Sequence, residues 1–206
     1  IVSSQYASFM QEGTVSYLYF AERLTEFPLG IIAVSIATVL LPNLSSYVSK
    51  GDYDKFHETY TFTLRLMLFT LIPALAGLIA LSVPICSVLY QRGEFTYEAA
   101  LFTSQTLVGY CFGLWAVGGL RVTAPAFYAM QDTKTPVVVA FFAFILNAAL
   151  GYILGFTLGL SHTGLALANS ASSIFNFLLL IYLLERRTGE LKAGHIIRFS
   201  MLITAI

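Results

Sequence analysis

Long apolar stretches alternate with short polar turns along most of this chain. A stretch of about 20 apolar residues can cross the hydrocarbon core of a bilayer as a helix. Partial helices are predicted at residues 1–10 and from about residue 196, and between them lie five complete spans, near residues 14–47, 56–90, 97–130, 136–157 and 165–184. The pattern therefore predicts an all-α integral membrane protein, built as a polytopic helix bundle.

Three of the predicted spans are longer than a straight crossing requires. At 1.5 Å per residue, a helix of that length reaches about 50 Å, whereas the hydrocarbon core is about 30 Å thick. Such helices must bend, break or project into water. Proline removes an amide donor and clashes with the preceding turn. We therefore expect proline-broken helices, with the breaks marked by Pro28, Pro42, Pro73, Pro84 and Pro125.

The composition agrees with a membrane protein and excludes several other classes. Of the residues, 57% are hydrophobic and 11% are charged, against about 25% charged in an average soluble domain. Eleven Lys and Arg balance eleven Asp and Glu, so net charge does not indicate a nucleic-acid partner. Cys86 and Cys111 lie in apolar stretches without a metal-binding motif, and are interpreted as packing residues. No catalytic motif supports an enzyme.

The positive residues predict an orientation. The loops "SKGDYDK", "QDTKT" and "ERRTGELK" hold Lys50, Lys55, Lys134, Arg186, Arg187 and Lys192, whereas the alternate loops hold only Arg92. By the positive-inside rule, the first set of loops faces the cytoplasm.

The stretch "YFAERLTEFPLG" places Glu22, Arg23 and Glu26 inside the first complete span. Charges within a membrane normally face a bundle interior or a watery cavity. Glu22 and Glu26 share a helical face, and Arg23 lies one turn from Glu26. Two interpretations stay open: a local ion pair that offsets its own burial, or a group that lines a cavity beside a helix broken at Pro28.

Other polar residues within the spans are weaker candidates. Arg121 is flanked by apolar residues and is either a salt-bridge partner or a cavity residue, whereas Arg65 is close enough to Lys55 to extend to the interface. Asn147 and Asn169 could offer oxygens to a coupling cation, although hydrogen bonds between helices are the commoner use of buried Asn.

Four long strings resemble, in order and spacing, the MurJ (MviN) family of lipid II flippases, within the multidrug/oligosaccharidyl-lipid/polysaccharide exporter superfamily. They are "VSYLYFAERLTEFPLGIIAVSIATVLLPNLS", "PICSVLYQRGEFT", "APAFYAMQDTKTPV" and "HTGLALANSASSIFNFLLL". The resemblance implies that residues 1–190 form most of the second six-helix lobe of an exporter fold and that residues 191–206 begin a following helix.

The resemblance implies a multi-pass protein of the bacterial inner membrane that moves lipid II, the undecaprenyl-pyrophosphate-linked peptidoglycan precursor, by alternating access. The implied partners are lipid II, membrane lipids and the missing first lobe, with no nucleic acid. No cofactor is expected, although a monovalent cation or the membrane potential could couple transport. The alternatives are a related exporter of another polysaccharide-lipid or of drugs by ion antiport, and a membrane scaffold without transport.

The resemblance also suggests which residues bind the substrate. Arg23 occupies the arginine position of the family's "ADRL" motif, which reads "AERL" here because Glu22 replaces the usual Asp. Arg121 stands where many members carry Lys. The candidate substrate-binding residues are Arg23, Glu22, Glu26 and Arg121, and the candidate cation-binding residues are Asn147 and Asn169.

Overall fold

The computed structural model describes residues 2–10 and 13–189. The helix predicted from about residue 196 lies outside these ranges. The helices are α1 (Val2–Ala7), α2 (Thr14–Lys50), α3 (Tyr53–Ala80), α4 (Ser82–Tyr90), α5 (Tyr97–Ala129), α6 (Lys134–Tyr152), the π-helical turn η1 (Ile153–Thr157) and α7 (Ser161–Thr188).

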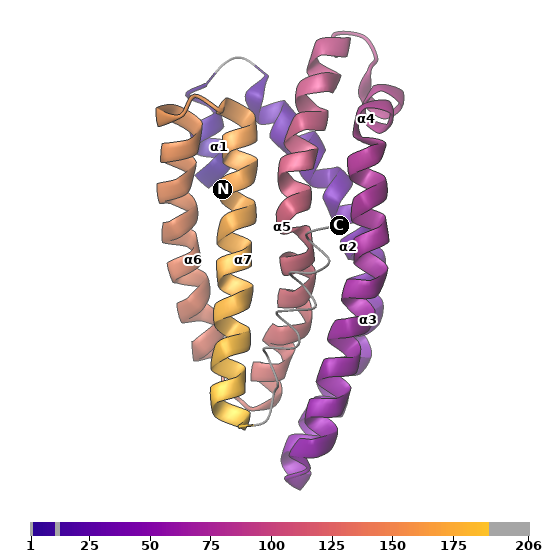
Figure 1. The fold of residues 1–206 in the computed structure, drawn as a ribbon, viewed down its shortest axis with the longest axis vertical. Coiled ribbons are helices and arrows are strands. Elements are labelled where there is room, and N and C mark those ends of the chain that lie inside the picture. Colours follow the sequence, from indigo (N-terminus) through magenta and orange to yellow (C-terminus); the bar gives the residue numbers. More distant parts are fainter. Residues whose placement is uncertain (1, 11–12, 190–206) are drawn as a thin grey trace.

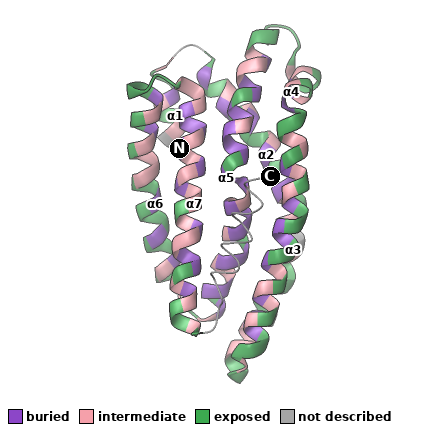
Figure 2. Cartoon of the chain, viewed as in Figure 1, coloured by how far each residue is buried: buried purple, intermediate pink, exposed green. Residues whose placement is uncertain are grey.

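Helix α5 is the centre of the bundle. It packs against α2, α3, α4 and α7, whereas α6 packs mainly on α7 (Figure 1). Buried residues are frequent along α5 and sparse on the outer sides of α6 and α3 (Figure 2). Tyr60 of α3 and Thr123 of α5, both fully buried, join these two helices through a hydrogen bond of 2.9 Å between their hydroxyl oxygens.

The exposed surface is apolar, as a membrane protein requires. Segment Lys134–Thr157 has a mean hydropathy of 2.4 over its most apolar window, yet only 17% of that window is buried. Four helical segments within the described ranges are long and apolar enough to cross a membrane: Tyr53–Ala80, Tyr97–Ala129, Lys134–Thr157 and Ser161–Thr188. The prediction of an all-α, multi-pass membrane protein is confirmed. Cys86 and Cys111 are free and buried, as expected of packing residues.

Fewer helices break at prolines than the sequence suggested. Helix α2 continues through Pro28 and Pro42, α3 through Pro73, and α5 through Pro125. One interruption does lie in a predicted span, at Leu81 between α3 and α4, three residues before Pro84. A proline deletes one backbone hydrogen bond, and membrane helices tolerate that loss when packing holds the flanking turns together. The expected breaks at the other four prolines were therefore wrong.

The connections between helices alternate between the two ends of the bundle (Figure 1). The links at residues 51–52 and 130–133 lie at the lower end in this view, and those at residues 91–96 and 158–160 lie at the upper end. This arrangement groups the loops into the same two sets that the distribution of positive residues defines.

Glycines allow α5 and α7 to approach closely. A Cβ atom added to Gly109 would lie 2.9 Å from the Cβ of Ala166, and one added to Gly113 would overlap Ser170. The Ser170 hydroxyl also donates a 2.7 Å hydrogen bond to the carbonyl oxygen of Gly109. Small residues that let helix backbones meet are typical of membrane interfaces. These two glycines therefore serve helix packing.

Candidate functional site

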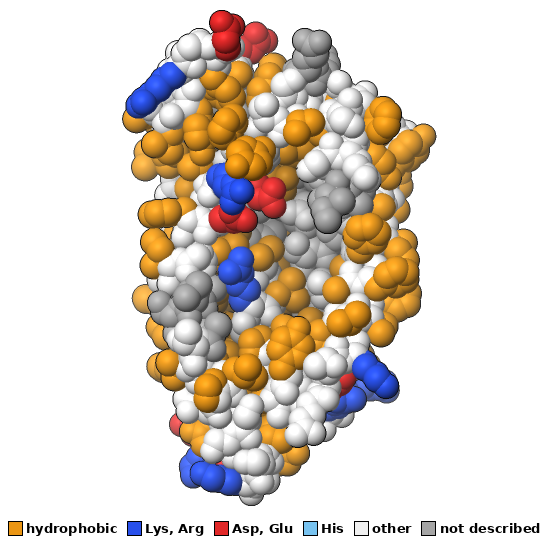
Figure 3. Space-filling model, turned by 180° about the vertical axis from the view of Figure 1, so that it is seen from behind, with side chains coloured by type: hydrophobic (Ala, Val, Ile, Leu, Met, Phe, Trp, Pro, Cys, Tyr) orange, Lys and Arg blue, Asp and Glu red, His pale blue; other side chains and the backbone are white. Residues whose placement is uncertain are grey.

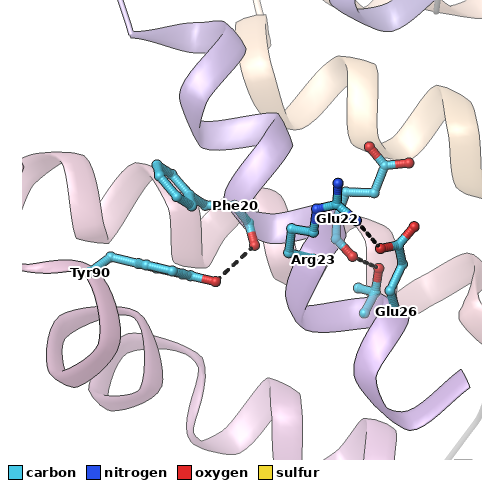
Figure 4. Close-up of polar contacts among 6 residues, drawn as sticks. Phe20, Glu22, Arg23, Glu26 and Tyr90 are labelled. Atoms are coloured by element: carbon cyan, nitrogen blue, oxygen red, sulfur yellow. Dashed lines mark hydrogen bonds and ion pairs between the residues drawn. The ribbon is translucent and has the colours of Figure 1, made fainter. Parts of the chain in front are cut away.

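Helix α2 presents Glu22, Arg23 and Glu26 on its exposed side. The Nη1 atom of Arg23 lies 2.8 Å from Oε2 of Glu26, and the two side chains are 57% and 50% exposed. The guanidinium also lies over the ring of Tyr19, with its Cζ 5.0 Å from the ring centroid. Figure 4 shows both carboxylates projecting from the same side of the helix. We call Glu22, Arg23 and Glu26 the α2 charge cluster.

Hydrophobic patterning explains why the α2 charge cluster is exposed. Leu18, Ala21, Thr25 and Leu29 recur at helical spacing and are buried. The cluster residues are exposed: Glu22 and Glu26 flank this buried stripe, and Arg23 points away from it. Acidic and basic side chains gather about midway along the rear face of the molecule (Figure 3). Placing a charged side chain against lipid at this depth would cost about 2.5–3.5 kcal/mol on insertion scales. This face is therefore suited to water, substrate or another part of the protein.

The cluster does not neutralise itself, because one arginine faces two glutamates. Among the described residues, no cation lies within 4.0 Å of the Glu22 carboxylate, whereas Glu26 is held by Arg23. The Thr25 hydroxyl donates to the backbone oxygen of Glu22 at 2.7 Å and fixes only the main chain there. The local ion pair that the sequence analysis considered does form between Arg23 and Glu26, but it remains open to solvent on the surface of this chain.

An aromatic group anchors α2 one turn before the cluster. The ring of Phe20 lies 4.5 Å from that of Tyr90 and 5.4 Å from that of Phe95, measured between centroids. The Tyr90 hydroxyl points to the backbone oxygen of Phe20 at 3.5 Å (Figure 4). Tyr90 ends α4 and Phe95 belongs to the "QRGEF" loop, so this loop positions the start of α2. Apolar spacing did not predict the contact, because the two segments are about 70 positions apart.

Arg121 lies on α5 and is exposed. Within the described part of the chain it forms no ion pair, so the structure does not join it directly to Glu22 or Glu26. A salt bridge between Arg121 and another described helix, one of the two sequence-based interpretations, is therefore absent.

The two candidate asparagines lie on neighbouring helices, and Ser172 connects them. Asn147 of α6 donates through Nδ2 to the Ser172 hydroxyl of α7 at 3.1 Å, and that hydroxyl reaches the backbone oxygen of Asn169 at 3.0 Å. Asn147 therefore makes the hydrogen bond between helices that is common for buried Asn. Among the described residues, no group of three or more His, Cys, Asp or Glu side chains could hold a metal ion.

Comparison with known proteins identifies the family of this chain. The family model described as lipid II flippase MurJ matches residues 1–206. The chain belongs to the MurJ family. Two relatives, each described as a probable lipid II flippase MurJ, are those of Vibrio cholerae, 40% identical over 88% of this chain, and Bdellovibrio bacteriovorus, 35% identical over 96% of it.

A solved MurJ structure has the same fold. It is described as lipid II flippase MurJ in an inward closed conformation, and it matches 90% of this chain with a TM-score of 0.81 and 34% identity. The chain spans 36% and 38% of the two MurJ relatives named above and 39% of the solved MurJ chain. It is therefore comparable to only part of a whole MurJ protein.

Asp132 joins three helices of this MurJ-family chain at one end of the bundle. Its Oδ1 accepts hydrogen bonds from the backbone amides of Lys134 at 3.1 Å and Thr135 at 3.0 Å, at the start of α6. Its Oδ2 lies 2.6 Å from Nη1 of Arg187, near the end of α7. The sequence showed "QDTKT" only as a loop, since nothing in the spacing relates Asp132 to Arg187.

The ionised form of Asp132 is the favoured one. Burial opposes ionisation, but the hydrogen bonds from Thr135 and the charge of Arg187 outweigh it and lower the pKa of Asp132 from the ordinary value of 3.8. A lowered pKa in the folded state stabilises the fold above the unfolded-state pKa, and this contribution is lost as the pH falls through the folded-state pKa.

We expect Asp132→Ala in the whole protein to lower the free energy of unfolding at neutral pH by about 1–2 kcal/mol, the usual cost of losing a helix cap. Thermal unfolding in detergent at a series of pH values measures the effect. The difference from the parent protein should shrink as the pH falls below 3.8, where the carboxyl of the unfolded parent is protonated, and should be lost below the lower pKa of the folded parent. Glu94→Ala, in an exposed loop, is the matched control. An undiminished difference in acid would contradict the role of the charge.

Proposed function

We propose that the whole protein, of which this chain is a part, is a lipid II flippase. Its α2 charge cluster would form part of the cavity that receives the lipid pyrophosphate. The match of the MurJ family model to the full chain carries this proposal. The exposed charges on a helix of a membrane bundle support it, since they suit a polar cavity and not lipid.

The chemistry of Arg23 suits a pyrophosphate. Guanidinium has five N–H donors in a planar arrangement and binds phosphate oxygens in pairs. Glu26 accepts from Nη1, and the Arg23 side chain is 57% exposed, so donors of its guanidinium stay accessible to a substrate. The stacked ring of Tyr19 and the Glu26 carboxylate would hold the guanidinium in place before the substrate arrives.

Further cations are needed, because the cluster holds two carboxylates and one guanidinium. We propose that Arg121 supplies one of them and that the missing first lobe supplies others. In this arrangement Glu22 and Glu26 orient Arg23 and keep the empty cavity hydrated. Alternating access requires two bundles that move about a shared site, so this chain would provide half of the cavity.

Two alternatives follow from other uses of the same architecture. A related exporter could move another polysaccharide-lipid, or drugs by ion antiport. A membrane scaffold without transport would need the cluster to be shielded from water, and the 57% and 50% exposure of the Arg23 and Glu26 side chains does not favour it. We also propose transport and not catalysis as the role of the whole protein.

The energy source is a separate proposal. A monovalent cation could be bound by side-chain oxygens of Asn147 and Asn169, or the membrane potential could act on the charges directly, without a cofactor. Transport by Asn147→Ala and by the parent, measured over a range of sodium concentrations, tests the first possibility. Equal rates and equal sodium dependence would exclude it.

Reconstitution of the whole protein tests the proposed function. Proteoliposomes should translocate lipid II and should leave a polyprenyl-linked saccharide without the peptide, and a cationic drug, at background. Translocation of either of these compounds in preference to lipid II would favour the related exporter. In cells, we expect the protein in the bacterial inner membrane fraction, with lipid II and membrane lipids as its partners.

A further inference from the structure

A second polar feature lies away from the α2 charge cluster, at the end of the bundle that holds Lys50 and Lys55. A groove with a volume of about 560 Å³ runs between the last turn of α2 and the first three turns of α3. We call it the α2–α3 groove. Its lining residues are Tyr47, Lys55, Glu58, Thr59, Thr61, Phe62 and Arg65.

The charges in the α2–α3 groove are not equally available. Lys55 is already bound by Asp52, with its Nζ 3.1 Å from the Asp52 carboxylate. Within the described residues, neither Glu58 nor Arg65 has an oppositely charged group within 4.0 Å. The groove therefore offers one unpaired cation and one unpaired anion.

Helix geometry places these two charges at different depths. Glu58 and Arg65 are seven residues apart, so they lie on the same face of α3 with a rise of about 10 Å between their Cα atoms. Side chains on a helix lean toward its N-terminus, which for α3 is the end at the loop of residues 51–52. The guanidinium of Arg65 therefore leans from the apolar region toward Glu58 and the interface, as a long cationic side chain does in a membrane.

An apolar surface surrounds Arg65 on the same face of α3 and continues toward the centre of the bilayer. Phe62 is 66% exposed, Leu66 is 45% exposed and Phe69 is 73% exposed. Together with Arg65, these residues follow the spacing i, i+3, i+4, i+7 that forms one side of a helix. The groove is thus polar at the interface and hydrophobic toward the centre of the bilayer.

We propose that the α2–α3 groove binds a phospholipid with an ethanolamine headgroup. The phosphate accepts hydrogen bonds from Arg65, the primary ammonium donates to Glu58, and the acyl chains lie along Phe62, Leu66 and Phe69. Glu58 disfavours an acidic headgroup such as that of phosphatidylglycerol, because it places no ammonium beside the carboxylate to offset the charge of the phosphate. A choline headgroup is also disfavoured, because its quaternary ammonium has no N–H to donate to the carboxylate.

Binding of phospholipids to the purified whole protein tests this site. Phosphatidylethanolamine, phosphatidylglycerol and phosphatidylcholine with identical acyl chains are titrated in detergent, and bound lipid is counted by native mass spectrometry. The parent should bind the ethanolamine lipid about tenfold more tightly than the choline lipid, as expected for one charge-assisted hydrogen bond. Soluble phosphorylethanolamine at the same concentration should not compete, since it lacks the acyl chains.

Matched variants assign the two charges. Glu58→Gln should remove the preference for ethanolamine over choline, and Arg65→Gln should weaken both lipids. Lys50→Gln, a cation beside the groove but not in its lining, should change neither. Unchanged selectivity in Glu58→Gln, or tighter binding of phosphatidylglycerol than of the ethanolamine lipid by the parent, would overturn the proposal. Competition by soluble phosphorylethanolamine would also overturn it, in favour of a free headgroup.

The lipid site does not depend on the proposed flippase function. Arg23 lies outside the groove, so the Arg23→Ala variant should retain the full lipid selectivity, whatever the effect of the substitution on transport. Loss of transport without loss of lipid selectivity therefore separates the two sites.

Discussion

Replacing Arg23 with alanine in the whole protein is expected to abolish lipid II translocation while leaving folding and membrane insertion nearly unchanged. The Arg23 side chain is 57% exposed in this chain, so its removal empties no packed volume. A bidentate contact to phosphate supplies two charge-assisted hydrogen bonds, worth about 1.5–3 kcal/mol each, so the rate should fall by about two orders of magnitude or more. Translocation per inserted molecule in proteoliposomes is the measurement.

Two further substitutions sharpen this expectation. Arg23→Lys should recover only part of the rate, because ammonium keeps the charge but loses the planar pair of donors. Arg92→Ala removes another exposed arginine, from the loop between α4 and α5, and should leave the rate unchanged. Full activity of Arg23→Lys would show that a point charge suffices and would exclude bidentate recognition.

Gly113→Leu is expected to prevent normal packing of α5 against α7. Even a Cβ atom at Gly113 would overlap the backbone and side chain of Ser170. The helices would have to separate, and the hydrogen bond from the Ser170 hydroxyl to the Gly109 oxygen would be lost with them. Overpacking alone typically costs about 1–3 kcal/mol, and a side chain forced against backbone has little room to adjust.

The yield of monodisperse protein and the thermal midpoint in detergent measure the effect of Gly113→Leu, and both should fall sharply. Gly77→Leu is the matched control, because nothing lies within 4 Å of a Cβ atom at that helical position. Removing a glycine from a helix interior there should be neutral or mildly stabilising, by up to about 1 kcal/mol. Equal behaviour of the two variants would show that the close approach of α5 and α7 is not required.

The sequence was a good guide to the helices because the bilayer imposes a simple length and polarity rule. The observed helices occupy the apolar stretches, and the loops lie at alternating ends. The breaks were harder to predict. A proline marks a missing hydrogen bond, but whether the helix ends there depends on its neighbours, and α2 continues through both Pro28 and Pro42.

The contacts of the candidate site also fall into two groups, those that the sequence could predict and those that it could not. The Arg23–Glu26 pair could be predicted because it is local, at a spacing of three residues along one helix. Contacts between distant segments could not, since spacing along the chain carries no information about them. The packing of Phe20 against Tyr90 and the bond between Asp132 and Arg187 are of this second kind. Contact between Arg121 and the substrate stays a prediction.

In the proposed function, the α2 charge cluster acts on the substrate and is not only a local ion pair. If the pair were structural, Arg23→Ala would chiefly lower protein abundance, because it would leave two carboxylates without a partner near hydrocarbon. Neutralising both glutamates should then restore the abundance of the Arg23→Ala variant. The two interpretations therefore predict different activities for the variant that combines Arg23→Ala with the neutralisation of both glutamates.

The most direct measurement is lipid II translocation per inserted molecule by the whole protein carrying Arg23→Ala, Glu22→Gln and Glu26→Gln together. The double glutamate variant with Arg23 intact is the control for loss of the carboxylates alone. A substrate-binding Arg23 predicts that the triple variant inserts normally and stays inactive. Recovery of the rate per molecule to that of the double glutamate variant would show that Arg23 forms a structural ion pair and does not bind the substrate.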